Sequence, residues 1–420
     1  MMNFVRNLVL LSILSFLAAS TAPVVLAEHG QWTQFLGPDR NGVTDGESLI
    51  QSWPETDPKV LWRASGGVGM SGVAVTDQLA ITLWNSSKGQ LVVALDRNSG
   101  EPAWKTVVAP NYENSMGDGP RATPTISRGQ VFAFTGEGLL VALNLADGKI
   151  NWTTDVFAGR DARPAEYGMA SSPLVVGDLV IVTAGGPNSA VTAIHTADGK
   201  VRWSAVDGAP GYSSPALLPI AGEQHLVTFT GQGVVGLNPN SGEVLWTYPF
   251  KTPYDCNTAT PISVDGHVFI SAGENHGCVM LEVLKSANNF QVNEVWSSVD
   301  VKSVLRNEWQ TSALIDGHLY GFDNVGSAGP VTHLSCVNAK TGETVWRQNR
   351  FGKANLVAAD GILWITTMKG EFVMVKATTA GYAELGRKKL FGKTRQAPAI
   401  DGGMAFIRDD AEVICIDIRR

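Results

Sequence analysis

The chain has 420 residues, of which 44% are apolar and 17% charged, and its formal net charge at pH 7 is −7. An acidic chain without a basic stripe argues against nucleic acid as a partner and gives no support for binding to an anionic membrane surface. Neither a low-complexity tract nor a long polar linker interrupts it, so we expect one large domain.

Residues 1–27 have the pattern of a secretory signal peptide. Arg6 supplies the positive charge, an apolar run extends from Leu8 to Ala19, and Val25-Leu26-Ala27 forms a small-residue cleavage site before Glu28. The apolar run is short for a membrane span, and an anchor that is never cleaved is the alternative. No cysteine stands at the cleavage site, where a lipid anchor would require one. We expect an exported protein, periplasmic or secreted, with no transmembrane anchor after cleavage.

Residues 28–58 precede the repeats described next, and we expect them to form an N-terminal extension. Within it, the segment Trp32–Gly42 contains the pairs Gly37-Pro38 and Asn41-Gly42, which predict two turns. The segment could cap one face of the domain or fill a groove between its repeating units, and the sequence leaves both alternatives open.

Tryptophan recurs in one local setting at steps of 42 to 51 residues. A period in this range indicates stacked supersecondary units. In most copies an Asp or Asn and then a Gly precede the Trp, which is typical of a strand, a tight turn and a second strand. The seven residues are Trp62, Trp104, Trp152, Trp203, Trp246, Trp296 and Trp346.

Two further strands precede each of these hairpins. The first begins with small hydroxyl or alanine residues and usually a proline, as in Ser171-Ser172-Pro173 and Ser213-Ser214-Pro215. Proline is tolerated at the start of a strand and on an edge, and the innermost strand of a propeller blade offers both. Four strands per repeat form the unit of a β-propeller.

The two ends of the chain complement each other. Residues 412–418 predict a third strand with no Trp strand after it, whereas residues 59–64 predict a Trp strand with no three strands before it. A decayed repeat lies between Val375 and Leu390, where Leu385 or Gly386 occupies the place of the Trp. We therefore predict an all-β, eight-bladed propeller of four-stranded antiparallel blades over residues 59–420, closed by pairing N-terminal and C-terminal strands in one blade.

The frame Ala94-Leu95-Asp96 to Ser99-Gly100 to Trp104 resembles the repeat of the pyrroloquinoline-quinone (PQQ)-like, or quinoprotein-like, β-propellers. The resemblance covers residues 59–418, and the segment Trp32–Gly42 is similar to the opening of secreted propellers in this group. The superfamily contains quinone-dependent alcohol dehydrogenases and the non-enzymatic assembly lipoprotein BamB. The resemblance therefore implies the architecture and leaves the activity open.

Four cysteines are present in a chain expected to reach an oxidising compartment. Cys278, Cys336 and Cys415 fall on or near third strands, where a small buried thiol is the simplest interpretation. Cys256 shares a blade with Cys278, so a bridge between these two is left open. No CxxC or paired Cys and His spacing predicts a metal site.

Propellers bind ligands at the mouth of the central funnel, which is lined by the starts of the innermost strands and the loops around them. The residues that this sequence places there include cations, carboxylates and aromatic rings, and they would suit a polar or anionic ligand with a ring to stack. The alternative is that these side chains fill a narrow channel and pair among themselves. The candidates are Met70, Arg121, Tyr167, Met169, Tyr212, Asp255, Asn257, Glu308, Trp309, Lys353 and Arg395.

For a quinone dehydrogenase, the resemblance implies a cofactor above Ca²⁺ held by carboxylates and amides, an Asp base and often a disulfide of adjacent cysteines. No two cysteines are adjacent here. Three carboxylate–amide pairs could supply hard oxygen ligands, although such residues at strand ends more often form turns, and none matches the family's ligand spacing. The pairs are Asp255 with Asn257, Glu274 with Asn275 and Asp323 with Asn324.

These observations favour an exported, non-catalytic binding or scaffold propeller of the cell envelope, a monomer that recognises a protein, a glycan or a small polar ligand at its funnel face. No cofactor and no metal are assigned. The alternative is a PQQ- and Ca²⁺-dependent alcohol or sugar oxidoreductase. A third hypothesis, a carbohydrate hydrolase or lyase, depends on Trp309, Tyr167, Tyr212 and nearby carboxylates.

Overall fold

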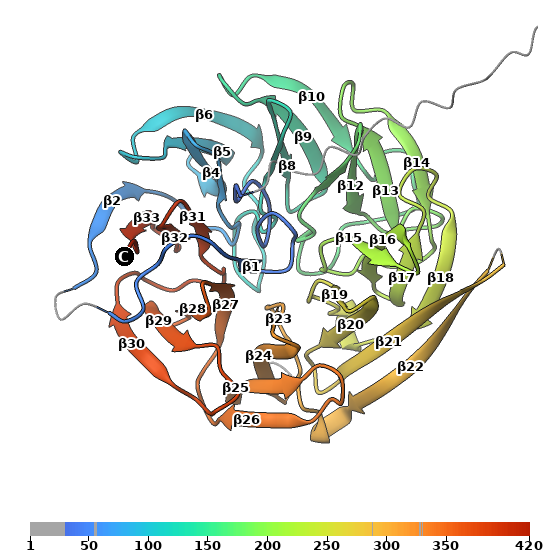
Figure 1. Cartoon of the computed structure of the whole chain (residues 1–420). Helices are drawn as coiled ribbons and strands as arrows, with labels where there is room; N and C mark the ends of the chain where they lie inside the picture. Colours follow the sequence, from blue (N-terminus) through green and yellow to red (C-terminus); the bar gives the residue numbers. More distant parts are fainter. Residues whose placement is uncertain (1–29, 54–56, 288, 327–328, 330) are drawn as a thin grey trace, which may run out of the picture.

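The computed structural model describes residues 30–53, 57–287, 289–326, 329 and 331–420. These residues form a ring of eight four-stranded antiparallel sheets around a central channel, which confirms the predicted propeller (Figure 1). The signal peptide predicted for residues 1–27 lies outside the described residues. No helix in the described part of the chain has the length and apolar character needed to cross a membrane.

We number the blades in chain order and give each from its innermost to its outermost strand. Blade 1 consists of β3 (Ala74–Val75), β4 (Leu79–Ser86), β5 (Gly89–Asp96) and β6 (Pro102–Ala109), and blade 2 of β7 (Thr125–Ser127), β8 (Gln130–Phe134), β9 (Leu139–Asn144) and β10 (Ile150–Asp155). Blade 3 consists of β11 (Leu174–Val176), β12 (Leu179–Thr183), β13 (Val191–His195) and β14 (Val201–Ala205), and blade 4 of β15 (Ala216–Ile220), β16 (Glu223–Thr230), β17 (Gly233–Leu237) and β18 (Val244–Pro249).

Blades 5 to 8 continue the ring. Blade 5 consists of β19 (Ile262–Val264), β20 (His267–Ala272), β21 (Gly277–Ser286) and β22 (Asn289–Val299), and blade 6 of β23 (Ala313–Ile315), β24 (His318–Val325), β25 (Val331–Asn338) and β26 (Thr344–Gln348). Blade 7 consists of β27 (Ala354–Ala359), β28 (Ile362–Thr367), β29 (Glu371–Lys376) and β30 (Glu384–Lys389), and blade 8 of β31 (Ala399–Asp401), β32 (Met404–Arg408), β33 (Glu412–Asp417) and β2 (Val60–Ser65).

Blade 8 closes the ring as predicted. Its outermost strand, β2, comes from the N-terminal part of the chain and pairs antiparallel with β33, placing Trp62 opposite Cys415. A register shift next to this Trp recurs beside the Trp of the other outer strands, for example beside Trp104 and Trp346. The closing strand is therefore equivalent to the fourth strand of the other blades.

The repeated Trp and Gly residues work as a pair across neighbouring blades. The indole N–H of Trp62 donates to the carbonyl of Arg97 at 2.8 Å, in the turn of the next blade. The ring also covers Gly100, where an added Cβ would lie 2.6 Å from the indole. Gly100 has a φ of +73°, so both its backbone conformation and the neighbouring ring require glycine. The same contact recurs between Trp104 and Gly148.

Blade 7 lacks its own Trp and receives one from the extension. Gly386 lies opposite Met374, the position that Trp346 occupies opposite Cys336 in blade 6. Trp53 fills the vacant space, because a Cβ on Gly386 would lie 2.0 Å from its ring. The Trp53 ring packs 6.1 Å from that of Trp364, in an edge-to-face arrangement. A residue more than 300 positions away therefore replaces the missing repeat residue.

The segment Trp32–Gly42, which we call the plug, lies in the central channel and bonds to several blades (Figure 1). The carbonyls of Trp32 and Thr33 accept the N–H groups of Val75 and Ile126, on the innermost strands of blades 1 and 2. Strand β1 (Val43–Thr44) then pairs parallel with β27. Of the two alternatives for this segment, the structure has the one in which it caps the channel.

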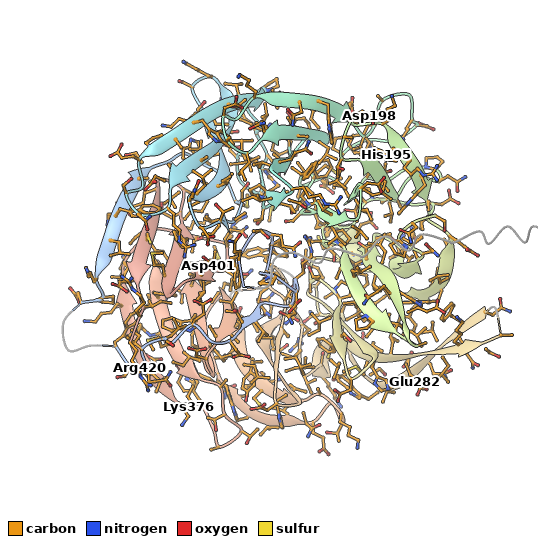
Figure 2. The ribbon with its side chains drawn as sticks, turned by 45° about the horizontal axis from the view of Figure 1, so that its top comes forward. His195, Asp198, Glu282, Lys376, Asp401 and Arg420 are labelled. Carbon is orange, nitrogen blue, oxygen red and sulfur yellow. The ribbon has the colours of Figure 1, made fainter. Side chains whose placement is uncertain are left out.

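Asp401 anchors the start of the plug. Its Oδ1 accepts the backbone N–H of Trp32 at 3.1 Å, and its carboxylate forms a buried ion pair with Arg97. Figure 2 shows Asp401 near the middle of the ring, whereas Asp198 and Lys376 lie at its periphery. Asp401 therefore connects blade 8 both to the plug, through Trp32, and to blade 1, through Arg97.

Candidate functional site

The funnel mouth is the end of the channel at which the innermost strands begin. On one side of it, Glu308, Trp309, Lys353 and Arg395 come together. The ammonium group of Lys353 lies 2.8 Å from a carboxylate oxygen of Glu308 and 4.2 Å from the centre of the Trp309 ring. The guanidinium carbon of Arg395 lies 4.9 Å from the same ring. Two cations therefore contact one indole, and one of them is also neutralised by a carboxylate.

On the other side, Tyr167 and Tyr212 stack with their ring centres 5.9 Å apart. The guanidinium of Arg121 lies 4.6 Å from the ring centre of Tyr112 and donates to the carbonyls of Tyr167, Gly117 and Gly119. Arg121 is 8% exposed, so its charge is held by backbone oxygen atoms within the wall. This half of the mouth is an aromatic surface supported by one buried cation.

Not every residue expected at the funnel faces it. Asn257 is fully buried and its amide is committed to the wall: Nδ2 donates to the carbonyls of Thr230 and Phe250, and Oδ1 accepts the Thr252 hydroxyl. Asp255 lies beside Gly231, where an added Cβ would come 2.8 Å from its carboxyl carbon. Asn257 is thus a wall residue, because buried amides have to satisfy their hydrogen bonds internally.

Two further residues, Met70 and Met169, occupy different places. Met169 is completely buried in the core between blades 2 and 3. Met70 is at the mouth, where its sulfur lies 3.5 Å from Nη1 of Arg395.

The sequence interpretation missed Tyr112 and Tyr254. Both lie in loops that lead into an innermost strand, as Tyr167 and Tyr212 do, so this shared position could have identified them. Tyr254 is 62% exposed and has a φ of +59°, and the next residue, Asp255, has a φ of +53°. Two successive non-glycine residues in the left-handed region are uncommon and are often found at functional sites.

At the mouth, the pKa values of Glu308 and Cys256 are shifted in favour of the neutral forms. Burial raises the pKa of Glu308, with Lys353 acting in the opposite direction. Burial, followed by the nearby carboxylates of Glu274, Asp255, Glu308 and Glu166, raises the pKa of the Cys256 thiol to about 12. An activated nucleophile requires a lowered pKa, so the thiol of Cys256 is not prepared for such a role.

We expect the thiol of Cys256 to react slowly with iodoacetamide. Because the thiolate is the reactive form and its pKa is near 12, its rate at pH 8 should be at least a hundredfold below that of the thiols in the unfolded chain. Mass spectrometry of the peptide that contains Cys256 over a pH series measures this rate. A native rate at pH 8 equal to the unfolded rate would contradict the carboxylate-rich surroundings.

All four cysteines are free thiols in the structure. The bridge between Cys256 and Cys278 that the sequence left open is therefore not formed. Cys278, Cys336 and Cys415 lie fully buried on the third strands β21, β25 and β33, as expected for small core thiols.

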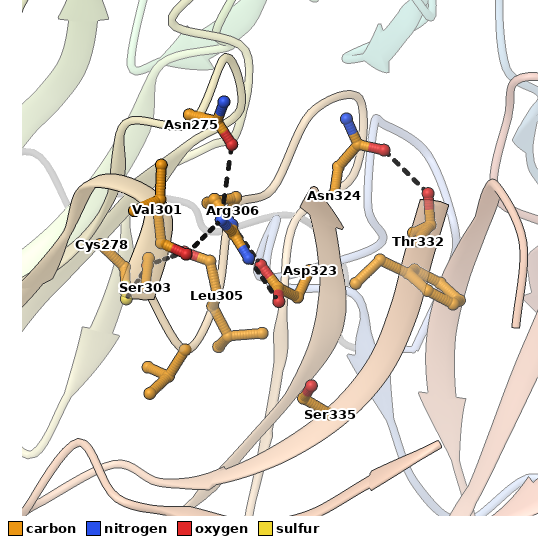
Figure 3. Close-up of polar contacts among 12 residues, drawn as sticks. Asn275, Cys278, Val301, Ser303, Leu305, Arg306, Asp323, Asn324, Thr332 and Ser335 are labelled. Atoms are coloured by element: carbon orange, nitrogen blue, oxygen red, sulfur yellow. Dashed lines mark hydrogen bonds and ion pairs between the residues drawn. The ribbon is translucent and has the colours of Figure 1, made fainter. Parts of the chain in front are cut away.

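Members of the carboxylate–amide pairs bond to other residues of the protein. Asp323 is completely buried and accepts hydrogen bonds from Nε and Nη2 of Arg306, at 2.6 and 2.9 Å (Figure 3). Nη2 of Arg347 lies 3.2 Å from the same carboxylate. Asn324 accepts the Thr332 hydroxyl, and Asn275 accepts the N–H of Gly326. Among the described residues no cluster of three His, Cys, Asp or Glu side chains could hold a metal ion. The oxygen atoms of Asp323, Asn324 and Asn275 are thus already engaged in hydrogen bonds or ion pairs within the protein.

Comparison with known proteins finds relatives that cover most of the chain. A family model described as outer membrane protein assembly factor BamB matches residues 46–161, 87–324 and 331–420. The BamB of Yersinia pestis is 27% identical over 351 residues, which cover 79% of this chain and 80% of that protein.

Two solved structures have the same fold. Quinohemoprotein alcohol dehydrogenase from Comamonas testosteroni has a TM-score of 0.67 at 14% identity, covering 94% of this chain and 82% of its own. BamB from Moraxella catarrhalis has a TM-score of 0.57 at 14% identity, covering 84% and 97%. At such identities the structural likeness shows architecture and says nothing of chemistry.

Proposed function

Since the chain belongs to the family described as outer membrane protein assembly factor BamB, we propose that it is a non-catalytic scaffold of the cell envelope, which binds a protein partner at its funnel mouth. Export through residues 1–27, which lie outside the described residues, is part of this proposal. By analogy with the name of its relatives, the process that it serves is the assembly of outer membrane proteins.

One observation carries the proposal: the reactive groups of the mouth are engaged with one another, while aromatic surface is left open. Glu308 and Lys353 form an ion pair, and Arg121 is held by three carbonyls. Tyr254 projects with 62% of its surface exposed. Tyrosine contributes large contact area at a low cost in conformational entropy and is common in protein interfaces. This arrangement suits docking better than proton transfer or nucleophilic attack.

We expect replacement of both Tyr254 and Tyr167 by alanine to impair the function without unfolding the protein. In cells that lack the gene, the double variant should restore less than half of the folded outer membrane barrel proteins that the wild type restores. The heat-dependent electrophoretic mobility of these proteins measures their folded fraction. Val201→Ala is the matched control, because Val201 is 47% exposed on the outer strand β14, away from the mouth.

If the double variant restores the folded outer membrane proteins fully, the funnel mouth is not the surface that binds the partner. If deletion of the gene leaves outer membrane proteins unchanged, the assembly role itself is wrong. The melting temperature of Val201→Ala should stay within about 1 °C of the wild type, because substitutions of exposed side chains rarely exceed 0.5 kcal/mol. That of the double variant should fall by no more than about 3 °C, since Tyr167 also loses its stacking contact with Tyr212.

The oxidoreductase alternative has a separate test. A ligand present at 100 times its dissociation constant stabilises a protein by about 2.7 kcal/mol. We expect Ca²⁺ with PQQ at high micromolar concentration to leave the melting temperature of the mature chain unchanged. A rise in melting temperature of about 3 °C that requires both Ca²⁺ and PQQ would indicate a quinone-dependent enzyme instead of a scaffold.

A further inference from the structure

At the end of the channel opposite the funnel mouth lies a cavity of about 1180 Å³, bounded by the plug and by blades 1 to 5. Turns between first and second strands form its rim, whereas the mouth is formed by the loops that precede the first strands. Its wall contains neutral polar side chains, among them Gln34, Asn41 and Ser127, and, besides Arg40, the charged residues Asp39, Asp77 and Arg128.

The cavity exists because the plug binds the channel wall unevenly. The plug bonds to the innermost strands β3, β7 and β27 through its backbone. It makes no backbone hydrogen bond to the described residues of β15 or β19, whose inner edges line the cavity. The space is thus a gap between the plug and blades 4 and 5.

Arg40 forms part of the cavity wall and is a buried cation without a counter-ion. It is 3% exposed, and it forms no ion pair with a carboxylate among the residues that the structure describes. Its Nη1 donates to Gln34 Oε1 and to the Pro173 carbonyl, and its Nη2 donates to the Ser172 carbonyl. Burial alone lowers the pKa of Arg40 to about 9, with no neighbouring charge contributing.

Two of the five N–H groups of Arg40 are left over. Among the residues that the structure describes, Nε has no hydrogen-bond partner, and Nη2 uses one of its two hydrogens. Nε and Nη2 are the edge of a guanidinium that binds a carboxylate side-on. Arg306 donates hydrogen bonds from its own Nε and Nη2 to the two carboxylate oxygens of Asp323, at 2.6 and 2.9 Å. A buried arginine elsewhere in this protein therefore has the partner that Arg40 lacks.

We propose that this cavity binds a ligand bearing a carboxylate, which pairs with the free Nε and Nη2 edge of Arg40. A buried charge without a partner is costly, and an incoming anion removes that cost. The amides and hydroxyls of the wall suit a polar body attached to the carboxylate. Because Nε itself is covered, the wall has to yield locally as the ligand enters.

Binding of N-acetylglycylglycine to the mature chain tests the site, with the uncharged N-acetylglycylglycinamide as its matched control and acetate as the minimal carboxylate. Calorimetry at constant ionic strength should give the acid at least a tenfold lower dissociation constant than the amide. Tighter binding of the peptide acid than of acetate would indicate a peptide-like body, and equal binding of the two would indicate a small carboxylate.

Three variants locate the site. Arg40→Gln should abolish the preference for the acid, and Arg128→Gln should keep it, because Arg128 lies on the exposed rim of the same cavity. Ser127→Trp fills the cavity without altering Arg40 and should abolish binding, so it decides the question if Arg40→Gln does not fold.

Equal binding of acid and amide, no binding at 50 mM probe, or a preference that survives in Arg40→Gln would each overturn the proposal. Tyr254→Ala should leave the affinity for the acid unchanged, since the mouth lies at the other end of the channel. Failure of this site and failure of the scaffold function are therefore distinguishable.

Discussion

Replacing Asp323 by alanine is expected to lower the free energy of unfolding by about 3–5 kcal/mol. The side chain of Asp323 is 0% exposed and that of Arg306 is 2% exposed, so the pair has no access to water. Without the carboxylate, the Arg306 guanidinium stays buried with a carbonyl of Val301 and the amide oxygen of Asn275 as its remaining acceptors. Neither carries a charge, so the cation is left uncompensated.

The melting temperature should fall by about 3–6 °C in a chain of this length. Arg347→Gln is the matched control, because Arg347 also contacts Asp323 but is 30% exposed. Its loss leaves the Arg306 pair intact and should cost about 1 kcal/mol or less. The double variant Asp323→Leu with Arg306→Met should recover most of the stability, since apolar residues of similar volume often replace a buried ion pair well.

Should Asp323→Ala prove no more damaging than Arg347→Gln, the carboxylate would not be the centre of this cluster. It would then again be available as a candidate calcium ligand.

Replacing Trp53 by alanine is expected to cost about 3 kcal/mol. The indole fills the place of the missing repeat Trp on blade 7, packing against Phe372 at 5.6 Å and Trp364 at 6.1 Å. Its removal opens a void beside two core rings and eliminates this contact between the extension and the blade. Thermal or urea unfolding measures the loss.

Gly386 supplies an independent test of this contact. Gly386→Ala should destabilise the wild type by about 1–3 kcal/mol, because the new methyl group would overlap the Trp53 ring. In the Trp53→Ala background the same substitution should cost less, so the two effects are not additive. Trp309→Ala is the control for loss of a tryptophan, since Trp309 contacts two cations at the mouth and should cost about 1 kcal/mol. Additive effects of the first two substitutions would mean that Trp53 does not occupy this place.

Much of the candidate site could be located from the sequence, but the role of its residues could not. The starts of the innermost strands follow from the repeat, which places Glu308, Trp309, Lys353 and Arg395 at the mouth even though blades 6 and 7 have no Pro there. Whether a polar side chain faces the funnel or the wall depends on the path of a loop. Asn257 turns inward because Thr230 and Phe250 present carbonyls to it.

The sequence by itself determined the architecture, because a propeller repeats one local pattern. Turn chemistry, the recurring Trp and the complementary chain ends predicted eight blades, the closing strand β2 and the decayed repeat at Gly386. The turns, the recurring Trp and the decayed repeat are each defined within about 50 residues, and the closing strand follows from comparing the two chain ends with that repeat.

Only the tertiary structure decided how the extension is used. Trp32 bonds to Asp401 across 369 residues, Trp53 fills the space above Gly386, and Arg40 is buried against blade 3 with no carboxylate partner in the described part of the chain. Such contacts have no period and no local motif. They arise where a non-repeating segment meets the inner surface of a closed ring, and that surface exists only after all eight blades have formed.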